Sequence, residues 1–170
     1  MTSQLRPMDE NDLELVLSWR NHPDIRRFMY TTHEISLAEH KRWFAGAKEK
    51  SETYLRIYEQ DGKPTGFVNV SLTRCPHVAD WGFYVAPDAS KGTGRRMGEA
   101  ALAFVFQELG LHKLCGQALG FNGGSVGFHK KLGFAEEGRL RDQHFDGEHY
   151  HDVVCFGLLA SEWQPNEVKE

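Results

Sequence analysis

The sequence predicts one α/β domain in which helices cover the faces of a mixed, mostly antiparallel central sheet. Three observations predict it. The hydrophobic period changes from helical to alternating and back, turn signals separate the segments, and 170 residues is the length of one ordinary domain. Apolar residues make up 40% of the chain and charged residues 26%, as is typical of globular proteins.

Composition disfavours several classes of protein. The formal charge of −4 lacks the basic footprint of a general nucleic-acid binder. We see no apolar run of membrane-spanning length and no apolar segment of a secretory signal near the start. Three cysteines without a CxxC pair suit neither a zinc site nor a disulfide framework. We therefore expect a protein of the reducing cytoplasm that acts away from membranes and nucleic acid.

The first third of the chain reads as helical. Asp9 is placed to cap a helix with Leu13, Val16 and Leu17 on its apolar face. Pro23 disfavours helix at the preceding residue, and we expect a short second turn over 25–30. The capping box Ser36-Leu37-Ala38-Glu39 predicts the start of another helix.

The rest of the chain alternates strands with two helices. Strands are expected over 53–59, 66–72, 80–85, 113–119, 139–145 and 149–159, with Asp61-Gly62 and Asp146-Gly147 as hairpin turns. Helices are expected from the glycine-rich loop to about residue 109 and over 125–132. This arrangement gives a domain over 4–163 and a polar tail over 164–170. The edge of the closing hairpin allows a homodimer.

A glycine loop joins the third expected strand to the following helix. In Gly92-Thr93-Gly94 the backbone N–H groups can turn toward one point, where the helix N-terminus adds partial positive charge. Lys91 and Arg95 would strengthen such a phosphate cradle, although a plain strand-to-helix turn explains the same residues. The Walker A pattern is absent, and Met97 stands where a dinucleotide fingerprint needs glycine.

A downstream segment points to a family. It reads Asn122-Gly123-Gly124-Ser125-Val126-Gly127-Phe128-His129-Lys130-Lys131-Leu132-Gly133-Phe134 and resembles the N-x-x-[SA]-x-x-x-[YH]-x-K-x-G-F segment of the GNAT N-acetyltransferases. The loop Gly92-x-Gly94 resembles the end of their acetyl-CoA motif. The resemblance covers nearly the whole chain. It implies the GNAT fold, acetyl-CoA as co-substrate without a metal, and splayed parallel strands over 80–85 and 113–119 at the acetyl-CoA site.

A narrower resemblance concerns the acceptor. Four segments look like those of the N-acetyltransferases of the pseudaminic acid pathway. They are Trp19-Arg20-Asn21-His22-Pro23, Phe28-Met29-Tyr30, Glu39-His40-x-x-Trp43-Phe44 and Trp81-Gly82-Phe83-Tyr84. This implies direct acetylation of UDP-4-amino-4,6-dideoxy-N-acetyl-β-L-altrosamine, a precursor for flagellin modification. Two alternatives stay open: an N-terminal alanine acetyltransferase of the ribosomal-protein type, with which the last residues share a pattern, and a non-catalytic acetyl-CoA-binding module.

The resemblance assigns residues to the cofactor. Backbone N–H groups at Phe83 to Val85 would polarise the thioester carbonyl. The residues expected to bind acetyl-CoA are Phe83, Val85, Lys91, Gly92, Thr93, Gly94, Arg95, Asn122, Ser125 and His129. His129 stands where the family usually has a tyrosine that protonates the departing thiolate, and Tyr84 is a second candidate donor. A helix histidine that faces solvent is the alternative reading of His129.

The acceptor side is assigned in the same way. Met29, Tyr30 and Phe44 would form a slot for a uracil ring, with Arg20 and His40 near phosphate and Trp81 at the same site, although Met29 and Phe44 also suit a core. Asp80, Glu39 and His40 are candidates for the general base. Histidines near the closing hairpin invite a metal reading if His144 pairs with His149, but alternation sends them to different faces, and we expect no metal.

Overall fold

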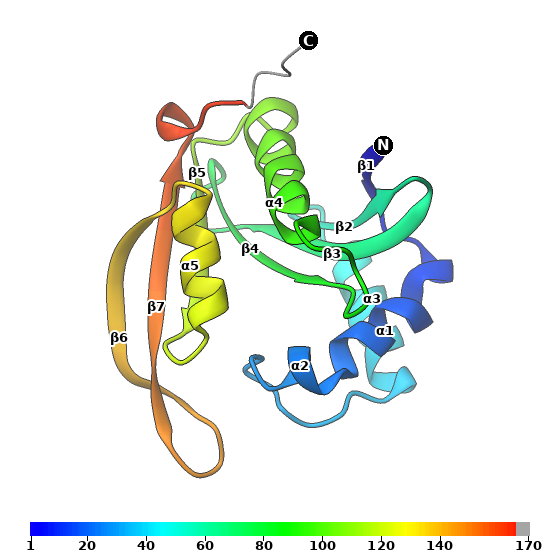
Figure 1. The fold of residues 1–170 in the computed structure, drawn as a ribbon, viewed down its shortest axis with the longest axis horizontal. Coiled ribbons are helices and arrows are strands. Elements are labelled where there is room, and N and C mark those ends of the chain that lie inside the picture. Colours follow the sequence, from blue (N-terminus) through cyan, green and yellow to red (C-terminus); the bar gives the residue numbers. More distant parts are fainter. Residues whose placement is uncertain (166–170) are drawn as a thin grey trace. The chain divides into compact units, whose positions relative to one another are not determined.

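The computed structural model describes residues 1–165, and the last part of the expected polar tail, 166–170, lies outside the described residues. Seven strands form one mixed sheet in the order β1-β2-β3-β4-β5-β7-β6 (Figure 1). The strands are β1 (Ser3–Pro7), β2 (Thr53–Gln60), β3 (Lys63–Leu72), β4 (Val78–Val85), β5 (Lys113–Leu119), β6 (Ala135–Phe145) and β7 (Tyr150–Leu159). The α-helices are α1 (Leu13–Asn21), α2 (Pro23–Arg26), α3 (Leu37–Glu49), α4 (Thr93–Ala103) and α5 (Gly123–Lys131). The predicted α/β class with a mostly antiparallel sheet is confirmed.

Contacts within the domain gather into two compact units. The first holds Met1–Ser71 and Gly82–Gly94, and the second holds Leu72–Trp81 and the chain from Arg95 onward. The division runs through β4 and the first turn of α4.

In the first unit, α1 and α3 share a hydrophobic core with the sheet. Its buried members include Val16 and Trp19 of α1, Phe44 of α3, and Ile57 and Phe67 of the strands. Asp9 accepts a hydrogen bond from the Asn11 amide at 2.8 Å, so the predicted cap is present, ahead of a short 3-10 turn that leads into α1. Burying apolar side chains of this size stabilises the fold by about 1.5–3 kcal/mol each.

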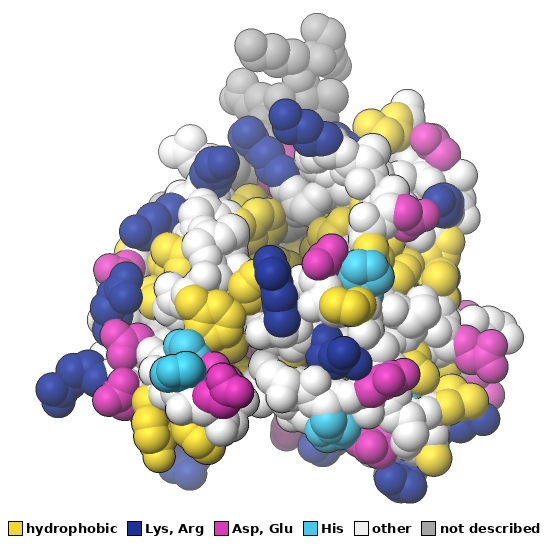
Figure 2. All heavy atoms as spheres, turned by 60° about the horizontal axis from the view of Figure 1, so that its bottom comes forward, with side chains coloured by type: hydrophobic (Ala, Val, Ile, Leu, Met, Phe, Trp, Pro, Cys, Tyr) yellow, Lys and Arg dark blue, Asp and Glu magenta, His cyan; other side chains and the backbone are white. Residues whose placement is uncertain are grey.

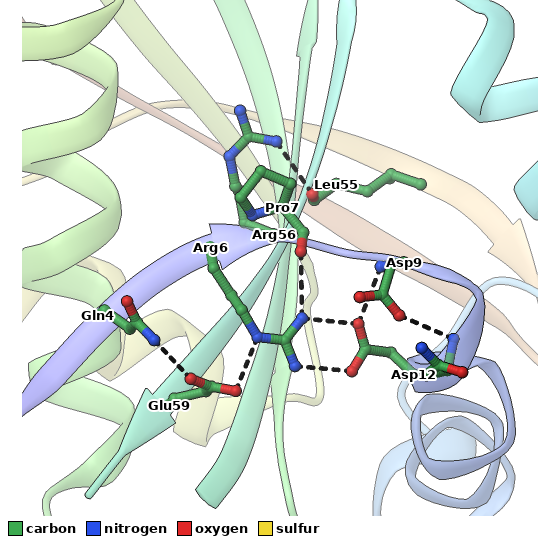
Figure 3. A network of polar contacts seen from close by, with 9 residues as sticks. Gln4, Arg6, Pro7, Asp9, Asp12, Leu55, Arg56 and Glu59 are labelled. Carbon is green, nitrogen blue, oxygen red and sulfur yellow. Dashed lines mark hydrogen bonds and ion pairs between the residues drawn. The ribbon is translucent and has the colours of Figure 1, made fainter. Parts of the chain in front are cut away.

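A polar network fastens β1 to the same unit (Figure 3). The Arg6 guanidinium bonds to both Asp12 oxygens, at 2.7 and 2.8 Å, and its Nε donates to Glu59 at 2.7 Å. Gln4 donates to the other Glu59 oxygen at 2.7 Å. Burial alone would raise the pKa of Asp12, but hydrogen bonds from Arg6 and the Asp9 amide outweigh it and lower that pKa. The hydrogen bonds from Arg6 and Gln4 also lower the pKa of Glu59.

In the second unit, β5, β7 and β6 pair antiparallel, and the start of β4 pairs parallel with β5. The parallel register runs from Val78 opposite Lys113 to Asp80 opposite Cys115, so the parallel pair expected from the resemblance is confirmed. Figure 1 shows α5 beside this part of the sheet. Aromatic rings stack within this unit: the ring of Trp81 is parallel to that of Phe134, and their centroids are 5.6 Å apart.

Several boundaries differ from the sequence expectation. Strand β1 was not predicted, because its five residues show no alternation of their own and it forms by pairing with β2. Strand β6 starts at Ala135, earlier than expected, and contains register shifts that break its pattern. The helix that follows the glycine loop ends as a π-helix over Phe104–Glu108. No helix in residues 1–165 has both the length and the hydropathy to cross a membrane.

Candidate active site

The glycine loop ends the first unit. Gly92 has φ +87°, a conformation that L side chains rarely adopt, and α4 starts at the next residue. Two hydrogen bonds of Thr93 hold the loop in place. Its buried hydroxyl donates to Gln60 at 3.1 Å, and its amide donates to the Ser90 carbonyl at 3.1 Å. The helix leaves further first-turn amides, including that of Gly94, without an intrahelical partner.

Cations flank this loop. Lys91 is exposed, and no carboxylate in the described part of the chain pairs with it. Arg95, on the first turn of α4, lies 3.0 Å from Glu99, and its side chain is 72% exposed. An ion pair so exposed is worth little, so Arg95 can exchange Glu99 for a phosphate at small cost. The first-turn amides of α4, a glycine at positive φ and an exposed lysine together fit a pyrophosphate.

In the second unit, Asn122 has a structural task at the start of α5. Its Oδ1 accepts from the Ser125 amide at 3.2 Å and thereby caps α5. No residue that the structure describes accepts a hydrogen bond from its Nδ2, which leaves this amide nitrogen available to a ligand. Ser125 is half-buried one turn before His129, as the spacing predicts.

His129 is only 1% exposed, so it is not the solvent-facing histidine that the alternative reading expected. Its Nδ1 lies 2.8 Å from the Ser125 carbonyl oxygen, which can only accept, so Nδ1 carries the proton. Its Nε2 then accepts from the indole N–H of Trp81 at 3.2 Å. Burial lowers the pKa of His129, against the opposing effect of the Ser125 hydrogen bond. The imidazole is therefore neutral with both nitrogens occupied.

Gly116 is the residue that makes this contact possible. A Cβ built on Gly116 would lie 2.5 Å from His129 Nε2 and 2.7 Å from Trp81 Nε1. Sequence reasoning missed this position, although a glycine inside a strand is a signal of close approach. Trp81 is 7% exposed and belongs to this buried cluster.

The remaining β4 candidates divide between the units. Asp80 lies at the surface of the second unit, where its neighbours exclude enough water to raise the pKa of its carboxyl. Tyr84, in the first unit, packs against Phe67 with ring centroids 5.1 Å apart. Burial raises the pKa of Tyr84, against the opposing charge of Arg20, so its phenol stays protonated. Phe83 and Val85 are half-buried on the same strand.

Two buried polar atoms in the first unit have no hydrogen-bond partner: Arg20 Nη1 and His40 Nε2. Arg20 donates from Nη2 to the Thr31 carbonyl at 2.8 Å and has no carboxylate partner in residues 1–165. Burial lowers the pKa of His40, against a hydrogen bond to the Leu13 carbonyl that Nδ1 donates, and the charge of Arg20 lowers it further. Each of these buried atoms, one a donor and one an acceptor, costs free energy unless a ligand satisfies it.

The three residues predicted to form a slot for uracil differ in their exposure. Phe44 is 5% exposed and sits in the hydrophobic core, so the core reading of this residue is correct. Tyr30 is 54% exposed and Met29 half-buried. The neighbouring Trp43 is 38% exposed on the same helix.

The other acid–base and metal candidates have ordinary surroundings. Glu39 is half-buried and lies 3.2 Å from His33. His144 pairs with His151 across the hairpin, and not with His149, the partner that the metal reading required. His151 instead lies 2.6 Å from Asp146, with Phe121 against its ring.

The family model of the acetyltransferase (GNAT) domain matches residues 4–135, which is most of the chain. The chain belongs to the GNAT acetyltransferases. It is therefore an N-acetyltransferase whose co-substrate is acetyl-CoA, and the glycine loop and α5 are the segments that carry the family's motifs.

Relatives with different names share this fold. An uncharacterized N-acetyltransferase, YokL, of Bacillus subtilis is 32% identical over 148 residues, which are 84% of this chain and 82% of that protein. Acetyltransferase PseH of Campylobacter jejuni is 30% identical over 110 residues, 63% of this chain and 66% of that one. The spermidine N-acetyltransferase of Vibrio cholerae, solved with CoA and spermine, superposes with TM-score 0.86 at 24% identity, covering 94% of this chain and 96% of that one. That structural likeness shows the fold alone.

Proposed function

We propose that this N-acetyltransferase acts on the amino group of a nucleotide-activated amino sugar, UDP-4-amino-4,6-dideoxy-N-acetyl-β-L-altrosamine, in pseudaminic acid biosynthesis for flagellin modification. The observation that carries the proposal is the half-buried Arg20 guanidinium with an unsatisfied Nη1. Such a group suits an anionic acceptor and repels a polyamine. The similarity to acetyltransferase PseH supports the same choice.

The surroundings of Arg20 also disfavour a polycation. Carboxylates of the same segment already have partners: Arg26 lies 3.9 Å from Glu34, and His33 lies 3.2 Å from Glu39. On the face shown in Figure 2, basic, acidic and apolar side chains are interspersed. A UDP-sugar needs only local positive charge, and Arg20 supplies it.

In the proposed reaction the neutral sugar amine attacks the thioester carbonyl carbon. The new C–N bond forms, the C–S bond breaks, and the amine loses one proton while the CoA thiolate gains one. Backbone N–H groups at Phe83 to Val85 stabilise the oxygen that gains charge, and the glycine loop with Lys91 and Arg95 holds the pyrophosphate. Asn122 and Ser125 hold the cofactor from α5.

We assign the proton-donor role to Tyr84 rather than to His129. The Tyr84 phenol stays protonated at neutral pH, whereas both His129 nitrogens are occupied by Trp81 and the Ser125 carbonyl. His129 then acts as a positioning residue that fixes Trp81. For the base, His40 offers an unpaired Nε2 lone pair, and Asp80 offers a carboxylate with raised pKa.

The test is release of CoA thiol with a panel of acceptors: the UDP-4-amino-sugar, a free amino sugar, spermidine, and a peptide that starts with Ala or Ser. We expect fast release with the UDP-amino-sugar alone. Release only with the peptide would move the chain to the ribosomal-protein type, and release only with spermidine would contradict the charge argument. Binding of acetyl-CoA without release from any acceptor would indicate a non-catalytic module.

The proposal extends to assembly and location. Strand β6 ends the sheet and is exposed at all but one of its eleven residues, with Leu140 and Phe145 among its exposed apolar side chains. We propose that it pairs with a second copy to form a homodimer, which analytical ultracentrifugation would detect. Three free cysteines suit the reducing cytoplasm, where we place the reaction.

A further inference from the structure

A pocket lies between α3 and the sheet within the first unit. Its volume is about 350 Å³. One wall is formed by α3 and the residue that follows it, with Arg42, Trp43, Gly46, Ala47 and Lys50, and the opposite wall by Thr53, Leu55, Asn69 and Ser71 of β2 and β3. Arg42, Gly46 and Lys50 follow one another at intervals of four residues, so they share one face of the helix.

The pocket carries positive charge without a counter-charge. Arg42 and Lys50 are exposed, and neither has an ion pair within residues 1–165. On the opposite wall, the Asn69 side-chain amide has no hydrogen-bond partner among the described residues. Two cations beside a free amide recognise an anion that also bears hydrogen-bonding groups.

Trp43 gives the pocket an aromatic surface. It is 38% exposed, which is unusual for so large an apolar ring. His40 stacks on it with ring centroids 5.1 Å apart, and Phe67 meets it edge-on at 5.9 Å. These contacts fix the indole, so it can bind a planar ring without further loss of side-chain entropy.

Gly46 keeps the pocket open. It stands in the middle of α3, where glycine weakens a helix relative to alanine. A Cβ at this position would meet nothing within 4 Å, so no packing constraint requires glycine. Any larger side chain would instead occupy the pocket that Gly46 lines.

We propose that this pocket binds the uridine end of the acceptor and its adjoining phosphate, with the uracil against Trp43 and the phosphate on Arg42 and Lys50. The identity of the ligand rests on the proposed function. Trp43 stacks on His40, and His40 lies close enough to Arg20 for that charge to lower its pKa. The second phosphate of the acceptor is therefore left for Arg20.

The experiment is calorimetric titration of UDP into the full chain with saturating CoA, which keeps UDP out of the pyrophosphate site. We expect UDP to bind, and uridine or inorganic phosphate to bind at least tenfold more weakly. Arg42→Gln and Lys50→Gln should each weaken UDP binding about tenfold, and Gly46→Leu should abolish it. Lys41→Gln and Ala45→Leu are matched controls on α3 outside the pocket, and they should leave the affinity unchanged.

Either of two results would overturn the proposed pocket: no UDP binding in the presence of saturating CoA, or a UDP affinity that is the same in Gly46→Leu as in the wild type. Equal affinity for UDP and phosphate would overturn the ring contact with Trp43. Failure of the proposed function has a different signature. If the chain binds UDP in this pocket but acetylates no amino sugar, the proposed function alone is refuted. If the chain acetylates the UDP-amino sugar but Gly46→Leu leaves its UDP affinity unchanged, the pocket alone is refuted.

Discussion

Burial decides what individual side chains of this enzyme do. Arg20 and His129 are both polar residues in largely apolar surroundings, yet all the ring nitrogens of His129 have partners and Arg20 Nη1 has none. A satisfied buried group stabilises the fold, whereas an unsatisfied one points to a ligand. The motifs predicted both residues for the site, but Trp81, the partner of His129 Nε2, lies 48 residues away in the sequence, so this contact could not be predicted from the sequence.

Arg20→Gln tests the anion contact. The change removes the charge and keeps a hydrogen-bond donor, so we expect the KM for the UDP-amino-sugar to rise about tenfold or more. The KM for acetyl-CoA should stay the same. Initial-rate kinetics measure both values, with Arg26→Gln as the control at a guanidinium already paired with Glu34. An unchanged acceptor KM would remove Arg20 from the site.

His129→Phe tests the positioning role. The substitution leaves the Trp81 indole N–H buried without an acceptor, so we expect the free energy of unfolding to fall by about 1–3 kcal/mol. The value of kcat should fall less than tenfold at a temperature where the variant is folded. Urea unfolding and thiol-release rates measure the two effects. A loss of kcat of a hundredfold or more in a stable variant would show that His129 is the acid.

At the scale of elements, local signals predicted most of the chain and tertiary contacts explain the rest. Asp9 caps the first helical segment, and the Gly62 and Gly147 turns, both at positive φ, close hairpins where the sequence indicated them. Strand β1 was missed because it depends on β2 and on Arg6, whose partners lie up to 53 residues away. Partners at such separation leave no local pattern.

Arg6→Gln tests how much this network holds β1 in place. Removing the guanidinium leaves Asp12 and Glu59, both buried, without their charge partner. We expect a loss of about 3 kcal/mol in the free energy of unfolding, measured by urea denaturation. Arg74→Gln, at an exposed position, should change it by less than about 0.5 kcal/mol. A loss below 1 kcal/mol for Arg6→Gln would mean that β1 is held by its backbone pairing alone.

At the scale of the whole molecule, the buried histidines link stability to pH. Burial lowers the pKa of His40 and His129 below the ordinary value, so the unfolded chain binds protons that the folded chain does not. Their contribution to stability is therefore present above pH about 6.5 and is lost as the pH falls below it. The lowered pKa values of Asp12 and Glu59 add a further loss near pH 4 and below.

Urea denaturation across pH 5 to 8 checks this linkage. The free energy of unfolding should fall from pH 7 to pH 5.5, and it should fall less in His129→Phe, which lacks one of the two groups. A wild-type stability that stays constant or rises over this interval would contradict the neutral, buried state assigned to these histidines.

The sharpest test of an anionic acceptor compares one amine in two forms. The measurement is kcat/KM for the 4-amino-sugar with UDP attached and for the same sugar without it, under saturating acetyl-CoA. If Arg20 and its surroundings bind the diphosphate, kcat/KM should be at least about a hundredfold higher with UDP, which corresponds to two charge-assisted hydrogen bonds. Equal values for the two forms would contradict the assignment of this GNAT enzyme to a nucleotide-activated sugar.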